Sequence, residues 1–187
     1  MEKILGIDEV GRGPIAGPVV VAGIQFVNPS EELLSQITDS KLLKPGIRSK
    51  LAVEIKSCSK YYIAFRTNEF IDDFGISKAI EQCIAEIINN DCFSADKIIF
   101  DGKWNPFKDC TNFYTLVKGD LHVKEIGAAS IIAKDYRDNW MIELDKLYPQ
   151  YGFASHKGYG TKRHLEAIKQ HGYCYLHRRS FNIHLEN

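Results

Sequence analysis

Two adjacent acidic residues near the start of the chain strongly constrain how this sequence can fold. Asp8 and Glu9 follow a short apolar run, and Gly11-Arg12-Gly13 comes directly after them. Successive side chains of a strand point to opposite faces, so both carboxylates can serve one site only at the end of the strand, where the backbone turns. The two glycines supply a turn and allow close approach to a ligand, and Arg12 offers a planar fork for phosphate. This stretch therefore indicates phosphodiester chemistry.

The predicted elements begin with strands and then alternate, which is typical of an α/β fold. Apolar, β-branched runs predict strands at residues 3–8, 18–27, 61–66, 97–101 and 113–118. Helical spacing of apolar residues predicts helices at residues 47–60, 69–90, 124–147 and 161–171. We expect Gly75 to divide the second helical range, which Thr67 or Asn68 caps. We expect Thr161 to cap the last helix and Gly172 to end it.

Four carboxylates form a candidate metal site. Asp8, Asp101 and Asp120 are each expected at or just past the end of a strand, so that they meet at one sheet edge together with Glu9. Mg²⁺ and Mn²⁺ prefer oxygen ligands, and two such ions about 3.5–4 Å apart promote phosphodiester hydrolysis. Each acid taken alone also fits a solvated residue at a strand end, whereas the four together favour a metal site.

The composition fits one domain and leaves a nucleic-acid partner open. Of 187 residues, 44% are hydrophobic, and Lys plus Arg equals Asp plus Glu at 24 each. The five cysteines form no Cys-x-x-Cys pair, so neither a zinc site nor a disulfide framework is predicted. The N-terminus leads straight into the first strand without a signal core, and no run reaches membrane-spanning length. We expect a cytoplasmic monomer with no membrane partner.

Motifs along the whole chain resemble those of type 2 ribonuclease H, the ribonuclease HII family. Gly6–Pro14 is similar to the signature of that family, and Lys118-Gly119-Asp120 resembles its bacterial branch. Further matching segments follow in family order: Asp39-Ser40-Lys41, Phe100-Asp101-Gly102, Ala128–Lys134, Tyr148–Phe153, His156–Tyr159 and His177–Phe181. Type 3 relatives carry Gly-Thr-Gly in place of Gly-Arg-Gly, so type 2 is the better match.

The resemblance implies an RNase H-like α/β fold with a mixed central sheet flanked by helices, as a single catalytic domain over residues 1–187. It implies an endonuclease that cleaves the RNA strand of RNA–DNA hybrids and nicks duplex DNA at single ribonucleotides, leaving a 3′-hydroxyl and a 5′-phosphate. By the same resemblance, Asp8, Glu9, Asp101 and Asp120 hold two Mg²⁺ or Mn²⁺ ions during catalysis.

The resemblance also implies how the substrate is bound. Gly11, Arg12, Gly13 and Tyr159 would sense the ribose 2′-hydroxyl, which both donates and accepts hydrogen bonds and is absent from DNA. Ser40 and Lys41 belong to a loop that would contact the substrate, and residues 149–187 would form a C-terminal substrate-contacting segment.

Other polar residues receive weaker expectations. Further candidates for phosphate contacts are Lys118, Lys134, Arg137, Lys157 and Lys162. The last quarter of the chain gathers basic residues between aromatic ones, namely Lys157, Lys162, Arg163, Lys169, Arg178 and Arg179. We expect His156 and His177 to shape loops through hydrogen bonds and Ser130 to serve close packing.

Two other functions stay open at this point. A catalytically silent hybrid-binding module would keep the glycine loop and Tyr159 but should lack one of the four acids. A different RNase H-like DNA nuclease would share the acids without needing Gly11-Arg12-Gly13 and Tyr159. Cleavage of an all-DNA duplex separates that nuclease from a ribonuclease.

Overall fold

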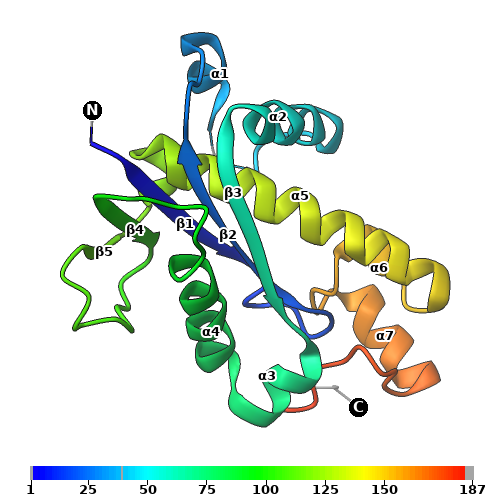
Figure 1. The fold of residues 1–187 in the computed structure, drawn as a ribbon. Coiled ribbons are helices and arrows are strands. Elements are labelled where there is room, and N and C mark those ends of the chain that lie inside the picture. Colours follow the sequence, from blue (N-terminus) through cyan, green and yellow to red (C-terminus); the bar gives the residue numbers. More distant parts are fainter. Residues whose placement is uncertain (1, 39, 184–187) are drawn as a thin grey trace.

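A mixed five-stranded sheet forms the centre of the structure, a computed structural model that describes residues 2–38 and 40–183 (Figure 1). Its strands are β1 (Ile4–Val10), β2 (Val19–Phe26), β3 (Ser59–Arg66), β4 (Lys97–Asp101) and β5 (Phe113–Leu116), in the order β3-β2-β1-β4-β5. β2 pairs antiparallel with both β1 and β3, whereas β1, β4 and β5 run parallel. The carboxyl ends of the three parallel strands therefore meet at one edge of the sheet.

Helices cover both faces of the sheet. They are α1 (Glu31–Gln36), α2 (Pro45–Ser57), α3 (Asn68–Phe74), α4 (Ile76–Ile88), α5 (Lys124–Leu147), α6 (Phe153–His156) and α7 (Lys162–His171), and Gly119–Leu121 form a 3₁₀ turn, η1. One buried cluster joins α3 and α4 to the sheet through residues such as Leu5 and Ile7. A second joins α2 and α5 to the other face through residues such as Val20 and Ile24.

The start of α5 lies directly against β1 because Gly6 has no side chain. A Cβ at Gly6 would lie 2.4 Å from the backbone of Glu125 and Ile126, closer than real contacts allow. From this point α5 crosses behind β1, β2 and β3 toward α6 (Figure 1). The glycine that opens the acidic motif therefore brings α5 to the strand that carries Asp8 and Glu9.

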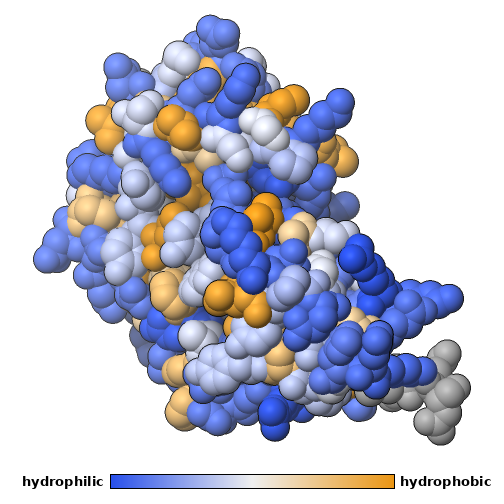
Figure 2. Space-filling model, turned by 90° about the vertical axis from the view of Figure 1, so that its right-hand side faces the viewer, coloured by the Kyte–Doolittle hydropathy of each residue, from blue (hydrophilic) through white to orange (hydrophobic). Residues whose placement is uncertain are grey.

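The C-terminal part of the chain packs on the far end of α5. A third buried cluster includes Ala16, Met141, Tyr151, Phe153 and Leu176. It joins α5, α6, α7 and the loop after β1, and these elements lie together in Figure 1. Figure 2 views this side, and hydrophilic residues cover most of it with hydrophobic ones scattered between them.

The predicted α/β fold with a mixed sheet is confirmed, and so are most of the elements. Thr67 and Thr161 accept hydrogen bonds from the backbone as helix caps, and Gly75 separates α3 from α4. The prediction missed α1 and α6, because helices of six and four residues are too short to show apolar periodicity. All five cysteines are free, as expected.

The first strand is longer than predicted. It runs to Val10, and Asp8 and Glu9 pair with Ala22 and Val21 of β2, so the acids lie inside the strand and not at its end. Among the described residues, no helix has both the length and the apolar character needed to cross a bilayer.

Candidate active site

One open cavity of about 520 Å³ lies at the edge where the parallel strands end. It brings together residues from β1, β4, η1 and α5 with two connecting segments. These are the loop of residues 40–44 before α2, called the Ser40 loop, and the turn of residues 157–161 between α6 and α7, called the Tyr159 turn. Its lining consists of Asp8, Glu9, Val10, Ser40, Lys41, Asp101, Gly102, Asp120, Ser130, Lys134 and Tyr159.

The cavity exists because β4 stops pairing with β1 before β1 ends. The parallel pairing ends at Ile7 and Phe100, whereas β1 and β2 remain paired to Val10 and Val20. Beyond Ile7, β1 therefore has no neighbour on the β4 side. Asp8 and Glu9 point to opposite faces, as strand alternation requires, but both reach the open edge. A missing strand neighbour, and not a turn, gives the two carboxylates a common site.

Asp8 faces α5 and is hydrogen-bonded to Ser130, which in turn contacts Ser40. The Ser130 hydroxyl hydrogen bonds to the Asp8 carboxylate, and the hydroxyls of Ser40 and Ser130 are 2.8 Å apart. Burial, followed by the charge of Glu9, raises the pKa of Asp8 well above its usual range, although the Ser130 hydrogen bond opposes this shift. The Ser130 hydroxyl therefore partly offsets the effect of burial on the Asp8 pKa.

Glu9 lies on the other face of β1 beside the glycine loop. Its Oε1 accepts a hydrogen bond of 3.1 Å from Arg12 Nη1, and burial raises its pKa to about 7 despite that partner. Its Oε2 is buried and accepts no hydrogen bond from any residue in the described ranges. A buried carboxylate oxygen without a partner calls for a cation or a donor from outside the chain.

Asp101 and Asp120 complete the acidic wall. Asp101 ends β4, and its Oδ1 accepts the backbone N–H of Gly119 at 3.0 Å. Gly119 in turn begins η1, which carries Asp120. Burial also raises the pKa of Asp101. The Lys118-Gly119-Asp120 turn thus fixes the position of Asp120 relative to Asp101.

These oxygen donors fit hard divalent cations. Burial and mutual repulsion make the charged carboxylates unfavourable without a counter-ion, and Glu9 Oε2 lacks a partner. Within residues 2–38 and 40–183, no three or more His, Cys, Asp or Glu side chains already stand in place to hold an ion unaided. Such an open arrangement is compatible with ions that keep waters and substrate oxygens among their ligands.

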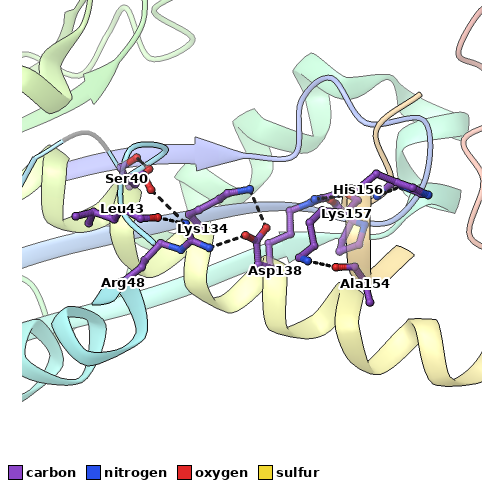
Figure 3. Close-up of polar contacts among 12 residues, drawn as sticks. Ser40, Leu43, Arg48, Lys134, Asp138, Ala154, His156 and Lys157 are labelled. Carbon is purple, nitrogen blue, oxygen red and sulfur yellow. Dashed lines mark hydrogen bonds and ion pairs between the residues drawn. The ribbon is translucent and has the colours of Figure 1, made fainter. Parts of the chain in front are cut away.

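Lys134 is the basic residue whose place in the cavity is best defined. Its Nζ lies 2.8 Å from Asp138 Oδ1, and Arg48 Nη2 lies 2.8 Å from Asp138 Oδ2. Arg48 also donates to the backbone oxygens of Ser40 and Leu43, so one network joins α5 to the Ser40 loop (Figure 3). Lys41 also lines the cavity, while Asp39 of the same motif lies outside the described residues.

Several residues that the sequence predicts to contact phosphate lie outside the cavity. Arg137 is fully buried and donates to three backbone oxygens, so the expectation that it contacts phosphate is wrong. Lys157 turns inward to the backbone oxygen of Ala154, while Lys118 and Lys162 are exposed and do not line the cavity. Arg178 is also fully buried, which removes it from the predicted basic surface.

The glycine loop lies beside the cavity and does not line it. Gly11 adopts a φ of 93°, and a Cβ there would lie 2.4 Å from Arg137 Nε, so both the turn and the packing require glycine. Gly13 does not need a positive φ, but a Cβ there would lie 3.8 Å from the Tyr159 ring. The structure thus places Gly13 beside Tyr159. The hydrogen bond between Arg12 and Glu9 connects the glycine loop to the carboxylates of the cavity.

The histidines support the Tyr159 turn. His156 receives the Gly158 N–H on Nδ1 and lies 2.8 Å from the Tyr151 oxygen through Nε2. His177 Nδ1 accepts the Cys174 N–H, so its Nε2 carries the proton toward His164 Nε2 at 3.0 Å. His164 Nδ1 then donates to the Tyr159 oxygen at 2.9 Å. The loop-shaping role expected for His156 and His177 agrees with these contacts.

Sequence reasoning missed Ser130 as a site residue. The spacing of four between Ser130 and Lys134 places both on one side of an otherwise Ala- and Ile-rich helix, which was a usable signal. The inward turn of Arg137 and Arg178 left no such signal, because a basic residue in a motif looks the same whether it is buried or exposed.

Comparisons with known proteins show the family and the fold. The ribonuclease HII family profile matches residues 5–184. The chain is 44% identical over 179 residues to ribonuclease HII of Francisella tularensis subsp. mediasiatica, which covers 95% of this chain and 94% of that protein. It is 43% identical over 188 residues to ribonuclease HII of Aliarcobacter butzleri, covering 98% and 92%.

Among solved structures, ribonuclease H2 from Pyrococcus horikoshii superposes with a TM-score of 0.80 at 27% identity, over 96% of this chain and 93% of that one. The fold is therefore RNase H-like, as the resemblance implied. Because the family profile matches and these relatives are 43–44% identical, the chain belongs to the ribonuclease HII family, whose members are metal-dependent ribonucleases that hydrolyse phosphodiester bonds.

Proposed function

We propose that this ribonuclease cleaves the RNA strand of RNA–DNA hybrids and nicks duplex DNA at single embedded ribonucleotides, leaving a 3′-hydroxyl and a 5′-phosphate. Asp8, Glu9, Asp101 and Asp120 act as ligands of two divalent ions, Mg²⁺ or Mn²⁺. The observation that carries this proposal is that four carboxylates from β1, β4 and η1 line one open cavity whose wall also includes Tyr159.

Each acid has a distinct position in this proposal. Asp8 and Glu9 approach from the two faces of β1, while Asp101 and Asp120 approach from the neighbouring strand and turn. When bound there, the ions supply an activated water and stabilise the leaving oxygen. Ser130, which is hydrogen-bonded to Ser40, orients Asp8, and Lys41 and Lys134 supply positive charge for the phosphate groups beside the acids.

Selectivity for ribose comes from Tyr159 and the glycine loop beside the cavity. The Tyr159 ring stands beside Gly13 and is partly exposed, so it can pack on the sugar of a bound nucleotide. Backbone groups of the Gly11-Arg12-Gly13 loop can donate to or accept from a 2′-hydroxyl. A deoxyribose would leave these polar groups without a partner, which disfavours cleavage of DNA.

We propose further that residues 1–187 act as one catalytic domain, with residues 149–187 as the segment that contacts the substrate. The place of Tyr159 in the cavity wall supports this, although Arg178 within that segment turns inward. The enzyme would act as a cytoplasmic monomer, where DNA that contains ribonucleotides is replicated and repaired.

The test is cleavage of an end-labelled DNA duplex that holds one ribonucleotide, beside the matched all-DNA duplex and a continuous RNA–DNA hybrid. Each substrate is incubated with Mg²⁺, Mn²⁺ or chelator. We expect metal-dependent cleavage at the ribonucleotide and of the hybrid, with no cut in the all-DNA duplex. End analysis of the products should give a 3′-hydroxyl and a 5′-phosphate.

Other outcomes identify the alternatives. Cleavage of both DNA duplexes would indicate a general nuclease and remove the ribose-sensing role of the glycine loop. Tight binding to the hybrid without cleavage in either metal would indicate a silent binding module. Cleavage of the continuous hybrid alone would refute nicking at single ribonucleotides while leaving ribonuclease activity intact.

A further inference from the structure

Two buried arginines stand behind the glycine loop, outside the cavity. Arg137 of α5 and Arg178 near the end of the chain are both fully buried. Within the described part of the chain, neither lies in ion-pair distance of a carboxylate. An unpaired buried cation is costly to hold in a fold, so this arrangement needs an explanation.

Their hydrogen bonds go to the backbone of the loop after β1. Arg178 donates to the oxygens of Gly11 at 2.6 Å, Arg12 at 3.2 Å and Gly17 at 2.9 Å. Arg137 donates to the oxygens of Pro18 at 2.8 Å and Ala16 at 3.2 Å. Five carbonyl oxygens between residues 11 and 18 are therefore fixed by two planar forks.

The Arg178 guanidinium also sets the direction of backbone N–H groups in this loop. No described peptide bond is cis, and in a trans peptide the N–H points opposite to the C=O of the preceding residue. Because the oxygens of Gly11 and Arg12 point to Arg178, the N–H groups of Arg12 and Gly13 point away from it. The side of the loop that is left for a ligand thus carries backbone donors in a fixed direction.

Arg137 also connects this loop to the Tyr159 turn. Its Nη1 donates to the Lys157 oxygen at 2.9 Å, and the N–H groups of Ile15 and Ala16 donate to the Gly158 oxygen. A Cβ at Gly158 would lie 2.3 Å from the Ala16 oxygen, so the two segments are in direct contact. The distance between the glycine loop and Tyr159 is therefore set by contacts that Arg137 holds in place.

We propose that Arg137 and Arg178 are positioning residues that fix the glycine loop and the Tyr159 turn relative to each other and so set selectivity for a ribonucleotide. This inference rests on the proposed function of that loop and of Tyr159. Neither arginine touches the substrate. Arginine suits this role because its planar guanidinium spreads five N–H donors over three nitrogens in fixed directions, whereas lysine has three donors on one freely rotating nitrogen.

The test replaces each guanidinium with an ammonium group of the same charge, in Arg178→Lys and Arg137→Lys. On the single-ribonucleotide duplex, we expect kcat to fall about tenfold or more while KM stays within about twofold, because the contact to ribose is lost mainly in the transition state. The matched control is Arg66→Lys, since Arg66 also donates to a backbone oxygen, that of Phe65, but lies on β3 and does not line the cavity.

Two further measurements separate positioning from general damage. The rise in melting temperature on adding Mn²⁺ should be the same in the lysine variants and the wild type, because the acids are not altered. In the wild type, the backbone amides of Ile15, Ala16 and Gly17, which donate to the Gly158 and Leu176 oxygens, should exchange hydrogen as slowly as those of β1. This result remains measurable if a variant does not fold.

Each result has a defined meaning. A folded Arg178→Lys variant with wild-type kcat overturns the inference, and so does fast amide exchange of Ile15, Ala16 and Gly17 in the wild type. Equal loss of kcat in Arg66→Lys would also overturn it. If the wild type shows no ribonucleotide-dependent cleavage, the proposed function fails, and the exchange result then reports on the positioning contacts separately.

Discussion

At the scale of single residues, the site depends on side chains whose neighbours decide their charge. Asp8 and Glu9 are adjacent in sequence but have different side-chain partners, a serine for one and an arginine for the other. Asp101 is fixed by a backbone N–H. Such partners orient a carboxylate before an ion arrives, which lowers the cost of assembling the site.

The first prediction concerns Asp101. Replacing it in Asp101→Asn keeps the side chain's shape and removes one negative charge from the cavity, so cleavage should fall by about a hundredfold or more. Binding to the hybrid should change little, because the groups that hold the duplex remain. Cleavage rates and a binding titration measure the two effects. Asp109→Asn is the control, since Asp109 is exposed and does not line the cavity. Near-normal cleavage by Asp101→Asn would exclude Asp101 as a metal ligand.

The second prediction concerns Ser130. Its hydroxyl lowers the pKa of Asp8, so Ser130→Ala should raise that pKa further and shift the acidic limb of the pH–rate profile toward higher pH. Cleavage should drop severalfold at acidic pH and stay near wild type at alkaline pH. The exposed Ser35 provides the control variant Ser35→Ala. A uniform loss at every pH would instead indicate a packing role for Ser130.

At the scale of elements, the C-terminal segment acts as a support for the cavity wall. The His177–His164 hydrogen bonds end at the Tyr159 oxygen, and His156 closes the same turn. Burial lowers the pKa of all three histidines, and that of His164 falls from 6.5 to about 4. These side chains are therefore neutral in the fold at neutral pH.

The third prediction follows from that lowered pKa. A group whose pKa is lower in the fold than in the unfolded chain contributes stability above its unfolded pKa and loses it on acidification. His164 should thus destabilise the fold as the pH falls from 6.5 toward about 4. Melting temperatures of the wild type and of His164→Phe across this range measure the effect as a difference. The wild type should lose more stability than the variant on acidification, and parallel curves would contradict the assignment.

At the scale of the whole molecule, we expect the acidic cavity to make the stability of the fold depend on divalent cations. The pKa of Glu9 is raised from 4.5 to about 7, so without an ion its contribution to stability is present below pH 4.5 and is lost as the pH rises through about 7. Asp8 and Asp101 shift in the same direction. A bound divalent ion reverses this effect, because it binds the charged carboxylates.

The fourth prediction is therefore a melting shift that depends on both metal and pH. An ion at about a hundred times its Kd stabilises the native state by about 2.7 kcal/mol, and each kcal/mol corresponds to about 2–4 °C for a chain of this size. Mg²⁺ or Mn²⁺ should raise the melting temperature by several degrees at pH 8 and by less at pH 5. The double variant Asp101→Asn with Asp120→Asn should lose most of the shift. An equal shift in that variant would place the ion elsewhere.

The amino-acid sequence by itself determined the order of the elements and the identity of the four acids. Apolar periodicity shows strands and long helices because these elements bury one face along their length. The helix predicted at residues 124–147 matches the bounds of α5, and Thr161 and Gly172 mark the ends of α7. The resemblance to a family then connected Asp8, Glu9, Asp101 and Asp120 to Gly11-Arg12-Gly13 and Tyr159.

Only the tertiary structure decided how these residues share one site. Asp8 and Glu9 meet at a common edge because β4 stops pairing at Phe100, which depends on a strand about ninety residues away in the chain. Ser130 became part of the site because Gly6 allows α5 to lie against β1. Arg137 and Arg178 turned inward because a buried loop has carbonyl oxygens that need donors. Burial and long-range pairing are properties of the packed chain. A local pattern such as the Ser130–Lys134 spacing can therefore suggest which residues share a helix face, but not what that face packs against.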